Sequence, residues 1–199
     1  MSSILPPLFK RIIEFFDSFP EIGSRQALRL FFWLIKQDEK TKKKFLENIN
    51  VTLSEIQFCQ NCFFPSINEL CNICANSHRR DDIMMIVARE TDVLTLESAK
   101  VFQGKYFILG GLILPFENKS IIRERLKILE SRLSTKQYKE IIIALPYTRE
   151  ALPTIKHLNI LVKKFPKLKF TFLARGIPLG GEIEFIDPET IKLSFVERK

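Results

Sequence analysis

Several features that would place the chain in a special class are missing from its sequence. Glycine occurs only 7 times in 199 residues, and apolar residues make up 46% of the chain, which together exclude collagen-like, low-complexity and disordered proteins. The longest uncharged apolar stretch, residues 106–116, is interrupted by Gly110 and Gly111 and is far shorter than the ~20 residues of a membrane-spanning helix. The first residues lack the pattern of a signal peptide, so we expect a cytoplasmic protein without a membrane segment.

The sequence does have an excess of positive charge, and that excess lies in its middle. The 31 Lys and Arg residues exceed the 23 Asp and Glu residues, which gives a net charge of +8. Residues 83–174 hold 16 of the cations against 8 acids, and much of this excess comes from Lys156, Lys163, Lys164, Lys167 and Lys169. Such a surplus is compatible with a polyanionic partner but does not require one, because compositional bias also produces basic sequences.

The N-terminal part of the chain has the apolar spacing of helices. Residues 8–19 show one apolar helical face, and residues 20–23, Pro-Glu-Ile-Gly, end that helix. A second helix is predicted from Ser24, as its N-cap, to Lys36. The charged residues 37–44 are predicted to form a turn that leads into a third helical segment.

The C-terminal part alternates strand-like and helix-like runs. The strand-like runs are residues 83–87, 106–109, 140–144 and 170–173, and the helix-like runs are residues 120–133 and 154–165. This alternation predicts a mostly parallel sheet with helices on its faces. After Gly180 and Gly181 we expect a short strand, and then a final helix with Asp187 as N-cap and Pro188 as its first residue.

All four cysteines lie in one short segment between these two parts. They are Cys59, Cys62, Cys71 and Cys74, spaced as two CxxC pairs. Two such pairs supply four thiolates around one ion, which is the closed ligand set of a structural zinc site, here with one Zn2+ per chain. Disulfides are the weaker explanation in a cytoplasmic chain, and an unmetallated or redox cluster is the alternative. His78 follows nearby, but with four thiols present we interpret it as a loop histidine.

Together these segments resemble the RecR family of bacterial recombination mediators. Residues 104–111, Gly-Lys-Tyr-Phe-Ile-Leu-Gly-Gly, are similar to the family's GxYHVLGG motif, with Phe107 at the usual histidine. Residues 173–187, LARGIPLGGEIEFID, are similar to its LARGLPVGGDLEYVD signature. The resemblance implies an α+β protein of four parts. These are a helix-hairpin-helix region at 1–57, a four-cysteine zinc motif at 58–82, an α/β Toprim-like domain at 83–174, and a C-terminal tail with a strand and a helix at 175–199.

The resemblance also implies a DNA contact in the helical region. Arg25 and Arg29 occupy the positions of the family's DNA-contacting lysine and arginine, although without the resemblance both would be interpreted as solvated helix charges. The family's hairpin has glycine where this chain has Glu21. The Glu21 carboxylate occupies the place where a glycine would let a phosphate approach the backbone. A glycine would also tolerate the backbone conformation of the turn better.

The Toprim-like part lacks the acids that Toprim enzymes use. Such enzymes place a glutamate at the end of the first strand and a pair of aspartates after a later one, to hold magnesium. Here the first position is Ala88, and no acidic pair follows the strand that ends at Ala144. We therefore predict that the chain is not an enzyme. Three acids remain nearby, and the resemblance implies that they dock a partner: Glu90, Asp92 and Glu150.

The function that the resemblance implies is that of a non-enzymatic DNA clamp in recombinational repair. It would bind single- or double-stranded DNA and assemble into a homo-oligomer, from a dimer to a tetrameric ring. With RecO-like and in some cases RecF-like proteins it would help to load RecA onto SSB-coated single strands, in the cytoplasm of a bacterium at the nucleoid. Two alternatives remain: a magnesium-dependent Toprim nuclease or primase, and a zinc-stapled interaction module that does not bind DNA.

Overall fold

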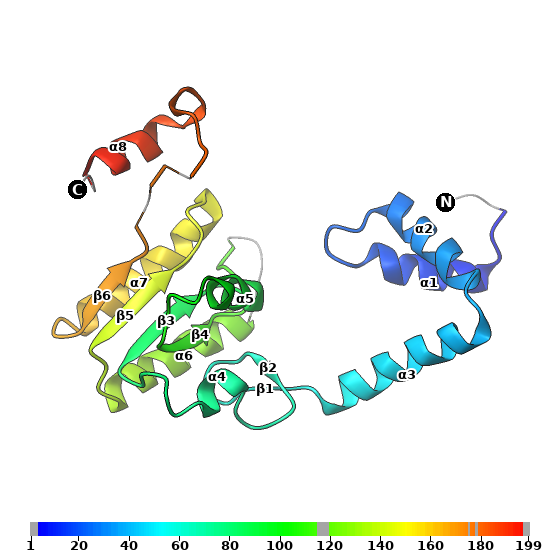
Figure 1. Ribbon diagram of the computed structural model, residues 1–199, viewed down its shortest axis with the longest axis horizontal. Coiled ribbons are helices and arrows are strands. Elements are labelled where there is room, and N and C mark those ends of the chain that lie inside the picture. The colour runs from blue at the N-terminus through cyan, green and yellow to red at the C-terminus, as the bar shows by residue number, and fades with distance from the viewer. Residues whose placement is uncertain (1–3, 115–119, 175, 178, 197–199) are drawn as a thin grey trace. The chain divides into compact units, whose positions relative to one another are not determined.

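The computed structural model describes residues 4–114, 120–174, 176–177 and 179–196. The chain forms two compact units, residues 1–56 and residues 57–199 (Figure 1). Arg175 and Pro178 of the C-terminal signature lie outside the described residues. Within the described ranges, no helix combines the length and the apolar character needed to cross a membrane.

The N-terminal unit consists of α1 (Pro7–Asp17), α2 (Ser24–Ile35) and α3 (Glu39–Glu55). The helices α1 and α2 form a hairpin whose small core contains Ile13, Ala27 and Phe31. This arrangement confirms the two helices predicted on either side of residues 20–23. The third helix, α3, buries none of its side chains.

Two details of this unit differ from the sequence-based expectation. The N-cap of α2 is Gly23 rather than Ser24, because the Gly23 carbonyl already accepts the first helical hydrogen bond, from the N–H of Ala27 at 3.0 Å. The helix α3 begins at Glu39, inside the stretch predicted to be a turn. Asp38 explains this early start, since its carboxylate caps the helix by accepting the Thr41 N–H at 2.8 Å.

The second unit begins with the cysteine segment and continues into an α/β domain. The cysteine segment contains β1 (Gln57–Phe58), β2 (Pro65–Ser66) and α4 (Asn72–Ala75). The elements that follow are β3 (Ile83–Val87), α5 (Glu90–Ala99), β4 (Lys105–Ile108), α6 (Ser120–Thr135), β5 (Glu140–Ala144), η1 (Arg149–Ala151), α7 (Leu152–Lys164), β6 (Lys169–Phe172), η2 (Ile183–Phe185) and α8 (Pro188–Val196).

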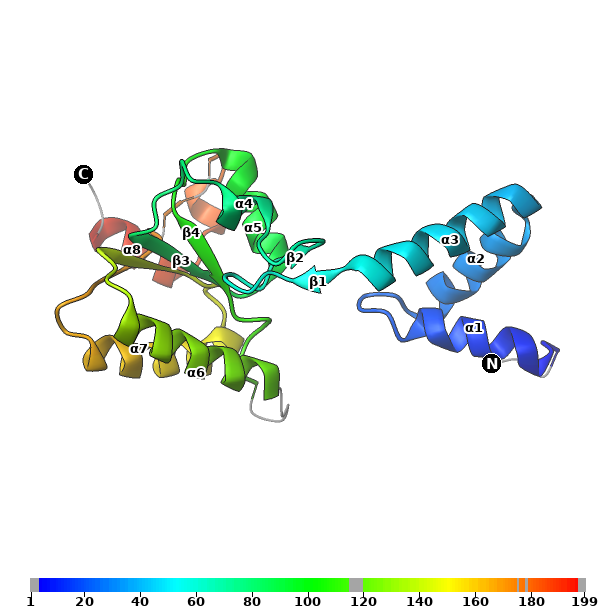
Figure 2. The same ribbon diagram turned by 90° about the horizontal axis from the view of Figure 1, so that it is seen from below.

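The sheet of this unit is parallel throughout and has the strand order β4-β3-β5-β6. The helices α6 and α7 cover one face, and α5 lies with the cysteine segment on the other (Figures 1 and 2). Both faces are therefore apolar: Ile86 and Ile143 point into the first layer, and Val87 and Ile108 into the second. The predicted parallel sheet is confirmed, with strand ends within one residue of those expected.

Two elements of the second unit differ from the expectation. The helix α5 follows β3 without having been predicted, because Val93 is its only fully buried residue and its apolar periodicity is weak. The strand expected after Gly180 and Gly181 is instead the 3-10 turn Ile183–Phe185. A strand needs a partner for its backbone groups, and no described strand pairs with this segment. Asp187 caps α8 as predicted, by accepting the Thr190 N–H at 2.9 Å.

Candidate functional site

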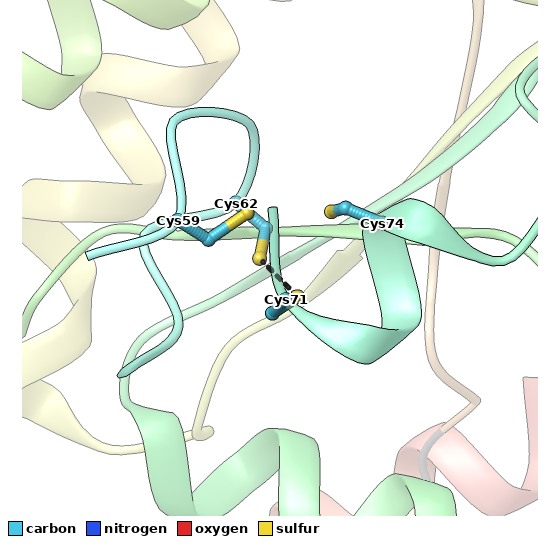
Figure 3. Close-up of side chains that lie close together, drawn as sticks. All are labelled: Cys59, Cys62, Cys71 and Cys74. Carbon is cyan, nitrogen blue, oxygen red and sulfur yellow. Dashed lines mark hydrogen bonds between the residues drawn. The ribbon is translucent and has the colours of Figure 1, made fainter. Parts of the chain in front are cut away.

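The four cysteines converge on one point at the start of the second unit (Figure 3). All are buried, and their sulfur atoms lie within 4.8 Å of one another. The Sγ atoms of Cys62 and Cys71 are 3.4 Å apart, and none of the four forms a disulfide. A tetrahedral zinc site with bonds of ~2.3 Å requires sulfurs about 3.8 Å apart. The donor set and its spacing therefore fit one zinc ion.

Local backbone structure brings each CxxC pair to one side of a turn. In the first turn the N–H of Phe63 bonds to the Cys59 carbonyl at 2.9 Å, and the Phe64 N–H points at the Cys62 sulfur at 3.5 Å. Phe63 has a φ of +64°, a left-handed conformation that few bulky residues adopt. In the second turn Cys71 precedes α4, and Cys74 lies one helical turn later on the same side.

The ionisation of the thiols explains why this cluster favours a cation. Burial raises the pKa of Cys59, but backbone N–H groups around its sulfur have the larger effect and bring that pKa down to about 7. Burial raises the pKa of Cys71 to about 11, and the Cys74 thiol together with burial raises that of Cys62 well above its usual range. One thiolate forms readily, but further negative charges oppose each other in a buried site. A divalent cation removes this repulsion.

The cysteine segment is an integral part of the sheet domain. The Cys62 carbonyl accepts the Ile108 N–H at 3.1 Å, so the first turn covers the free edge of β4. Phe63 packs edge-on against Phe107, with ring centroids 5.4 Å apart. The guanidinium of Arg132, on α6, donates to the carbonyls of two residues of the same turn. The cysteine turns are therefore joined to β4 and α6 by direct contacts.

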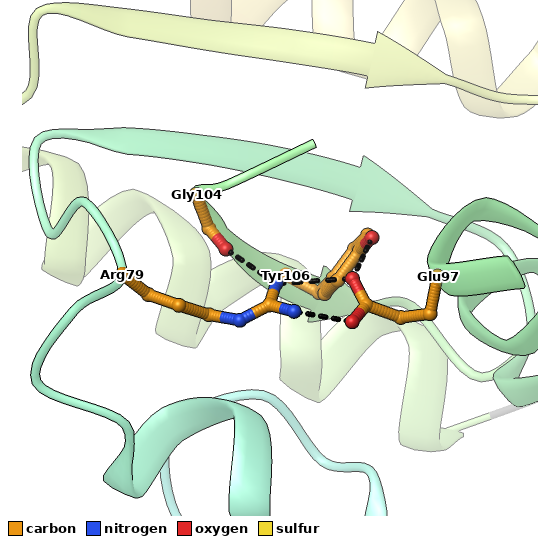
Figure 4. A network of polar contacts seen from close by, with 4 residues as sticks. All are labelled: Arg79, Glu97, Gly104 and Tyr106. Atoms are coloured by element: carbon orange, nitrogen blue, oxygen red, sulfur yellow. Dashed lines mark hydrogen bonds and ion pairs between the residues drawn. The ribbon is translucent and has the colours of Figure 1, made fainter. Parts of the chain in front are cut away.

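A second link is the polar network around Glu97, which joins the end of the cysteine segment to α5 and β4 (Figure 4). Arg79 forms a two-pronged ion pair with the Glu97 carboxylate and also donates to the Gly104 carbonyl at 3.1 Å. The buried Tyr106 hydroxyl donates to the same carboxylate at 2.6 Å. Glycine is required at position 104, because a Cβ there would lie 2.6 Å from the Ile83 carbonyl oxygen.

We predict that the network around Glu97 becomes weaker in acid. Burial opposes ionisation of Glu97, but hydrogen bonds from Arg79 and Tyr106 lower its pKa below the usual value. The unfolded carboxyl therefore takes up a proton first as the pH falls, so the stabilisation is complete above about pH 5 and is lost at lower pH. Glu97→Gln should reduce the free energy of unfolding by about 1–3 kcal/mol at pH 7. In urea titrations, the difference from the wild type should shrink at pH 3.5. A constant difference between these pH values would contradict this.

At the edge of the sheet where the strands end, the structure gives the predicted acids separate environments. Asp92 caps α5, since its carboxylate accepts the N–H groups of Ala88 at 3.1 Å and Arg89 at 2.8 Å. Glu90 lies 4.0 Å from the guanidinium of Arg125, and Glu150 is exposed on η1. Among the described residues, only the four cysteines bring three or more possible metal ligands together.

Arg125 is the residue at this edge that sequence reasoning missed. It is almost fully buried, donates to the Ile108 carbonyl at 3.1 Å, and lies over the Phe63 ring at 4.5 Å. Gly110 has a φ of +84°, and a Cβ there would lie 2.8 Å from the guanidinium. Gly110, in the motif at residues 104–111, therefore leaves room for the side chain of Arg125. Spacing on α6 alone carries no signal for such a role.

In the N-terminal unit, Arg25 and Arg29 lie one turn apart on α2, so their side chains share a face of the helix. Both are exposed, and neither forms an ion pair within the part of the chain that the structure describes. Glu21, in the hairpin before α2, has a φ of +65°, the conformation that glycine adopts most easily. The hairpin therefore keeps a glycine-like backbone with a carboxylate attached.

The fold and these sites define a Toprim-type α/β domain that carries a four-cysteine motif on one face and follows a helical-hairpin unit. Residues 82–159 match the family model described as "Toprim domain", and residues 176–199 match the one described as "RecR, C-terminal". The "Recombination protein RecR" of Hydrogenovibrio crunogenus is 33% identical over 193 residues, which cover 97% of this chain and 98% of the relative. Its namesake in Chromobacterium violaceum is 36% identical over 194 residues, 98% of each chain. The chain therefore belongs to the RecR family.

Proposed function

We propose that this chain, as a member of the RecR family, is a non-catalytic DNA-binding mediator of recombinational repair. With RecO-like and RecF-like partners it would help to load RecA onto SSB-coated single strands. The observation that carries the proposal is the pair Arg25 and Arg29, two exposed cations without acidic partners among the described residues, on the helix after the hairpin. Cations held on one helix face suit the phosphates of a DNA backbone.

The double variant Arg25→Ala/Arg29→Ala is expected to bind DNA more weakly by about tenfold or more at 0.1 M salt. Each lost phosphate contact should also lower the slope of log K against log salt by about one unit, and to the same extent for all sequences. Fluorescence anisotropy of labelled oligonucleotides over a salt series measures both quantities. An unchanged melting temperature would show that the fold is intact, because both side chains are exposed.

The hairpin offers a control of opposite sign. Glu21→Gly removes a carboxylate that repels phosphate and relieves the positive φ, so it should tighten DNA binding. Lys43→Ala/Lys44→Ala, on α3, removes two exposed positive charges from the same unit and serves as the matched control for the double arginine variant. Wild-type affinity in the double arginine variant would contradict a role of this helix in DNA binding.

We propose that the cysteine cluster holds one structural zinc ion per chain. Support comes from the sulfur spacing, the burial of all four thiols and the contacts that join the cluster to β4 and α6. A closed set of four thiolates leaves no open position for substrate, so its role is to hold the segment together.

We predict that the chain does not cleave or extend DNA. Support comes from Ala88 at the strand end, and from Asp92, whose carboxylate is engaged in the cap of α5. A labelled oligonucleotide incubated with the chain and Mg2+ should remain intact. Cleavage that disappears in a Glu90→Gln variant purified in the same way would revive the nuclease alternative, since contamination would affect both preparations.

We further propose that the acids at the strand-end edge dock a RecO-like partner and that copies of the chain assemble. Glu90 and Glu150 follow the neighbouring strands β3 and β5 at that edge. Assembly is supported by α3, which buries no side chain in its unit and exposes Leu46 and Leu53 by more than 60%. A chain that stays monomeric at micromolar concentration in mass photometry would contradict a clamp.

A further inference from the structure

The turns after α6 and α7 lie next to each other at the edge where the strands of the sheet begin (Figure 1). They are neighbours because they lead into β5 and β6, which pair in parallel. A hollow of about 590 Å³ is lined by residues 133–138, which form the end of α6 and the turn after it, and by residues 164–168, which form the end of α7 and its turn. A second hollow of about 280 Å³ shares Thr135, Lys136 and Tyr138 with the first and reaches Cys74. The two hollows thus meet at the turn after α6.

Positive charge dominates the lining of both hollows. We call the five cations that line them the basic edge surface: Lys105, Arg132, Lys136, Lys164 and Lys167. Asp81 is the acid that lines the smaller hollow, and the larger one has no acidic lining residue within the described ranges. Two further acids at this edge are engaged in ion pairs, Asp82 with Lys139 at 2.7 Å and Glu140 with Lys169 at 3.2 Å.

Local interactions explain some of these cations but not all. Lys105 pairs with Asp81 at 2.5 Å, and Lys164 pairs with Glu130 at 2.5 Å. A cation in the last turn of α7, such as Lys164, also compensates the helix dipole. Lys167 lies beyond the end of α7 and has no acidic partner among the described residues. Lys136 stands over the Tyr138 ring, with Nζ 5.3 Å from the centroid. It forms no ion pair among the described residues, although its charge assists Lys105 in lowering the pKa of Asp81.

We propose that Lys136 and Lys167 bind phosphate groups of a nucleic-acid strand that runs along the basic edge surface. The inference rests on the proposed DNA-binding function and adds a contact surface in the second unit to the one on α2. A phosphodiester chain suits the surface because the cations are spread along two connected hollows and do not surround a single point. Ammonium groups bind phosphates as point charges, so this contact would be independent of base sequence.

The test compares two double variants of the full chain that lose the same charge. Lys136→Ala/Lys167→Ala removes the proposed contacts. Lys127→Ala/Lys156→Ala removes two exposed lysines from earlier turns of α6 and α7, which lie about 8 Å and about 12 Å along the helices from the nearest lining residues, Arg132 and Lys164. The first variant should bind a single-stranded oligonucleotide about tenfold more weakly at 0.1 M salt. Its salt slope should fall by about 0.7 per lysine. The second should stay within about twofold of the wild type.

A direct readout comes from lysine acetylation followed by mass spectrometry. Bound oligonucleotide should protect Lys136 and Lys167 from the reagent and leave Lys156 reactive.

Equal binding by the two double variants, together with weak binding by Arg25→Ala/Arg29→Ala, overturns the inference and leaves the proposed function intact. A wild-type chain that binds no DNA at low salt overturns both. The inference is also overturned if the Lys136→Ala/Lys167→Ala variant alone loses binding to polyglutamate while its DNA binding is unchanged. That result would point to an acidic protein segment as the partner of this surface.

Discussion

Replacing Cys62 with serine is expected to destabilise the whole second unit and not only the cysteine turn. The variant leaves three thiolates, and the free energy of binding a structural zinc ion, on the order of 10 kcal/mol, is part of the folding free energy. The Cys62 carbonyl also bonds to β4, and its neighbour Phe63 packs against Phe107 in the sheet. We expect the free energy of unfolding to fall by more than about 3 kcal/mol, with lower solubility. Thermal unfolding measures the loss of stability, and the zinc content per chain measures the loss of the metal site.

The control for this prediction is His78→Ala, which removes the nearest histidine. His78 is not among the clustered ligands, so the variant should keep one zinc per chain and nearly the wild-type melting temperature. Protein prepared without chelators that contains no zinc and still melts as a folded chain would refute the metal site. A chelator that strips the zinc without lowering the melting temperature would refute its structural role.

The sheet and the cysteine cluster were predictable from sequence because their signals are local. Runs such as Glu140–Ala144 are apolar and bounded by turn residues, and a CxxC pair brings its own two sulfurs together. The start of α3 was missed because the charged residues 37–44 look like a turn until Asp38 is recognised as a cap. The strand expected near Ile183 failed because pairing is decided by the rest of the fold.

The links between the cysteine segment and the sheet were not predictable in the same way. Arg79 meets Glu97 18 positions away, and Arg132 meets Asn61 71 positions away, so no local pattern marks either pair. The acid Asp92 illustrates a different limit. Sequence placed it near the Toprim position, but only the structure shows that its carboxylate caps α5. The roles of Arg25 and Arg29 in DNA binding stay predictions.

Phe107 is the second position where we expect a large effect. It stands where the family's motif has histidine, and here it is fully buried, edge-on against Phe63 and beneath the guanidinium of Arg132. Phe107→Ala should cost about 3–5 kcal/mol of stability by leaving a cavity between the cysteine turn and the sheet. A double-mutant cycle of Phe107→Leu and Phe63→Leu should show a coupling of about 0.5–1.5 kcal/mol. Urea unfolding of the full, zinc-loaded chain gives these values.

Phe107→His tests whether this pocket has become apolar. The pocket is fully buried, so a charged imidazole there would be poorly solvated, and burial would lower its pKa below the ordinary value of about 6.5. The unfolded state would then bind a proton that the folded state does not, so the stability of the variant should fall as the pH drops from 8 to 5.5. Phe107→Leu, measured over the same range, cancels contributions from His78, His157 and the cysteines. A Phe107→His variant with wild-type stability and no added pH dependence would show that the pocket still accommodates the family's histidine.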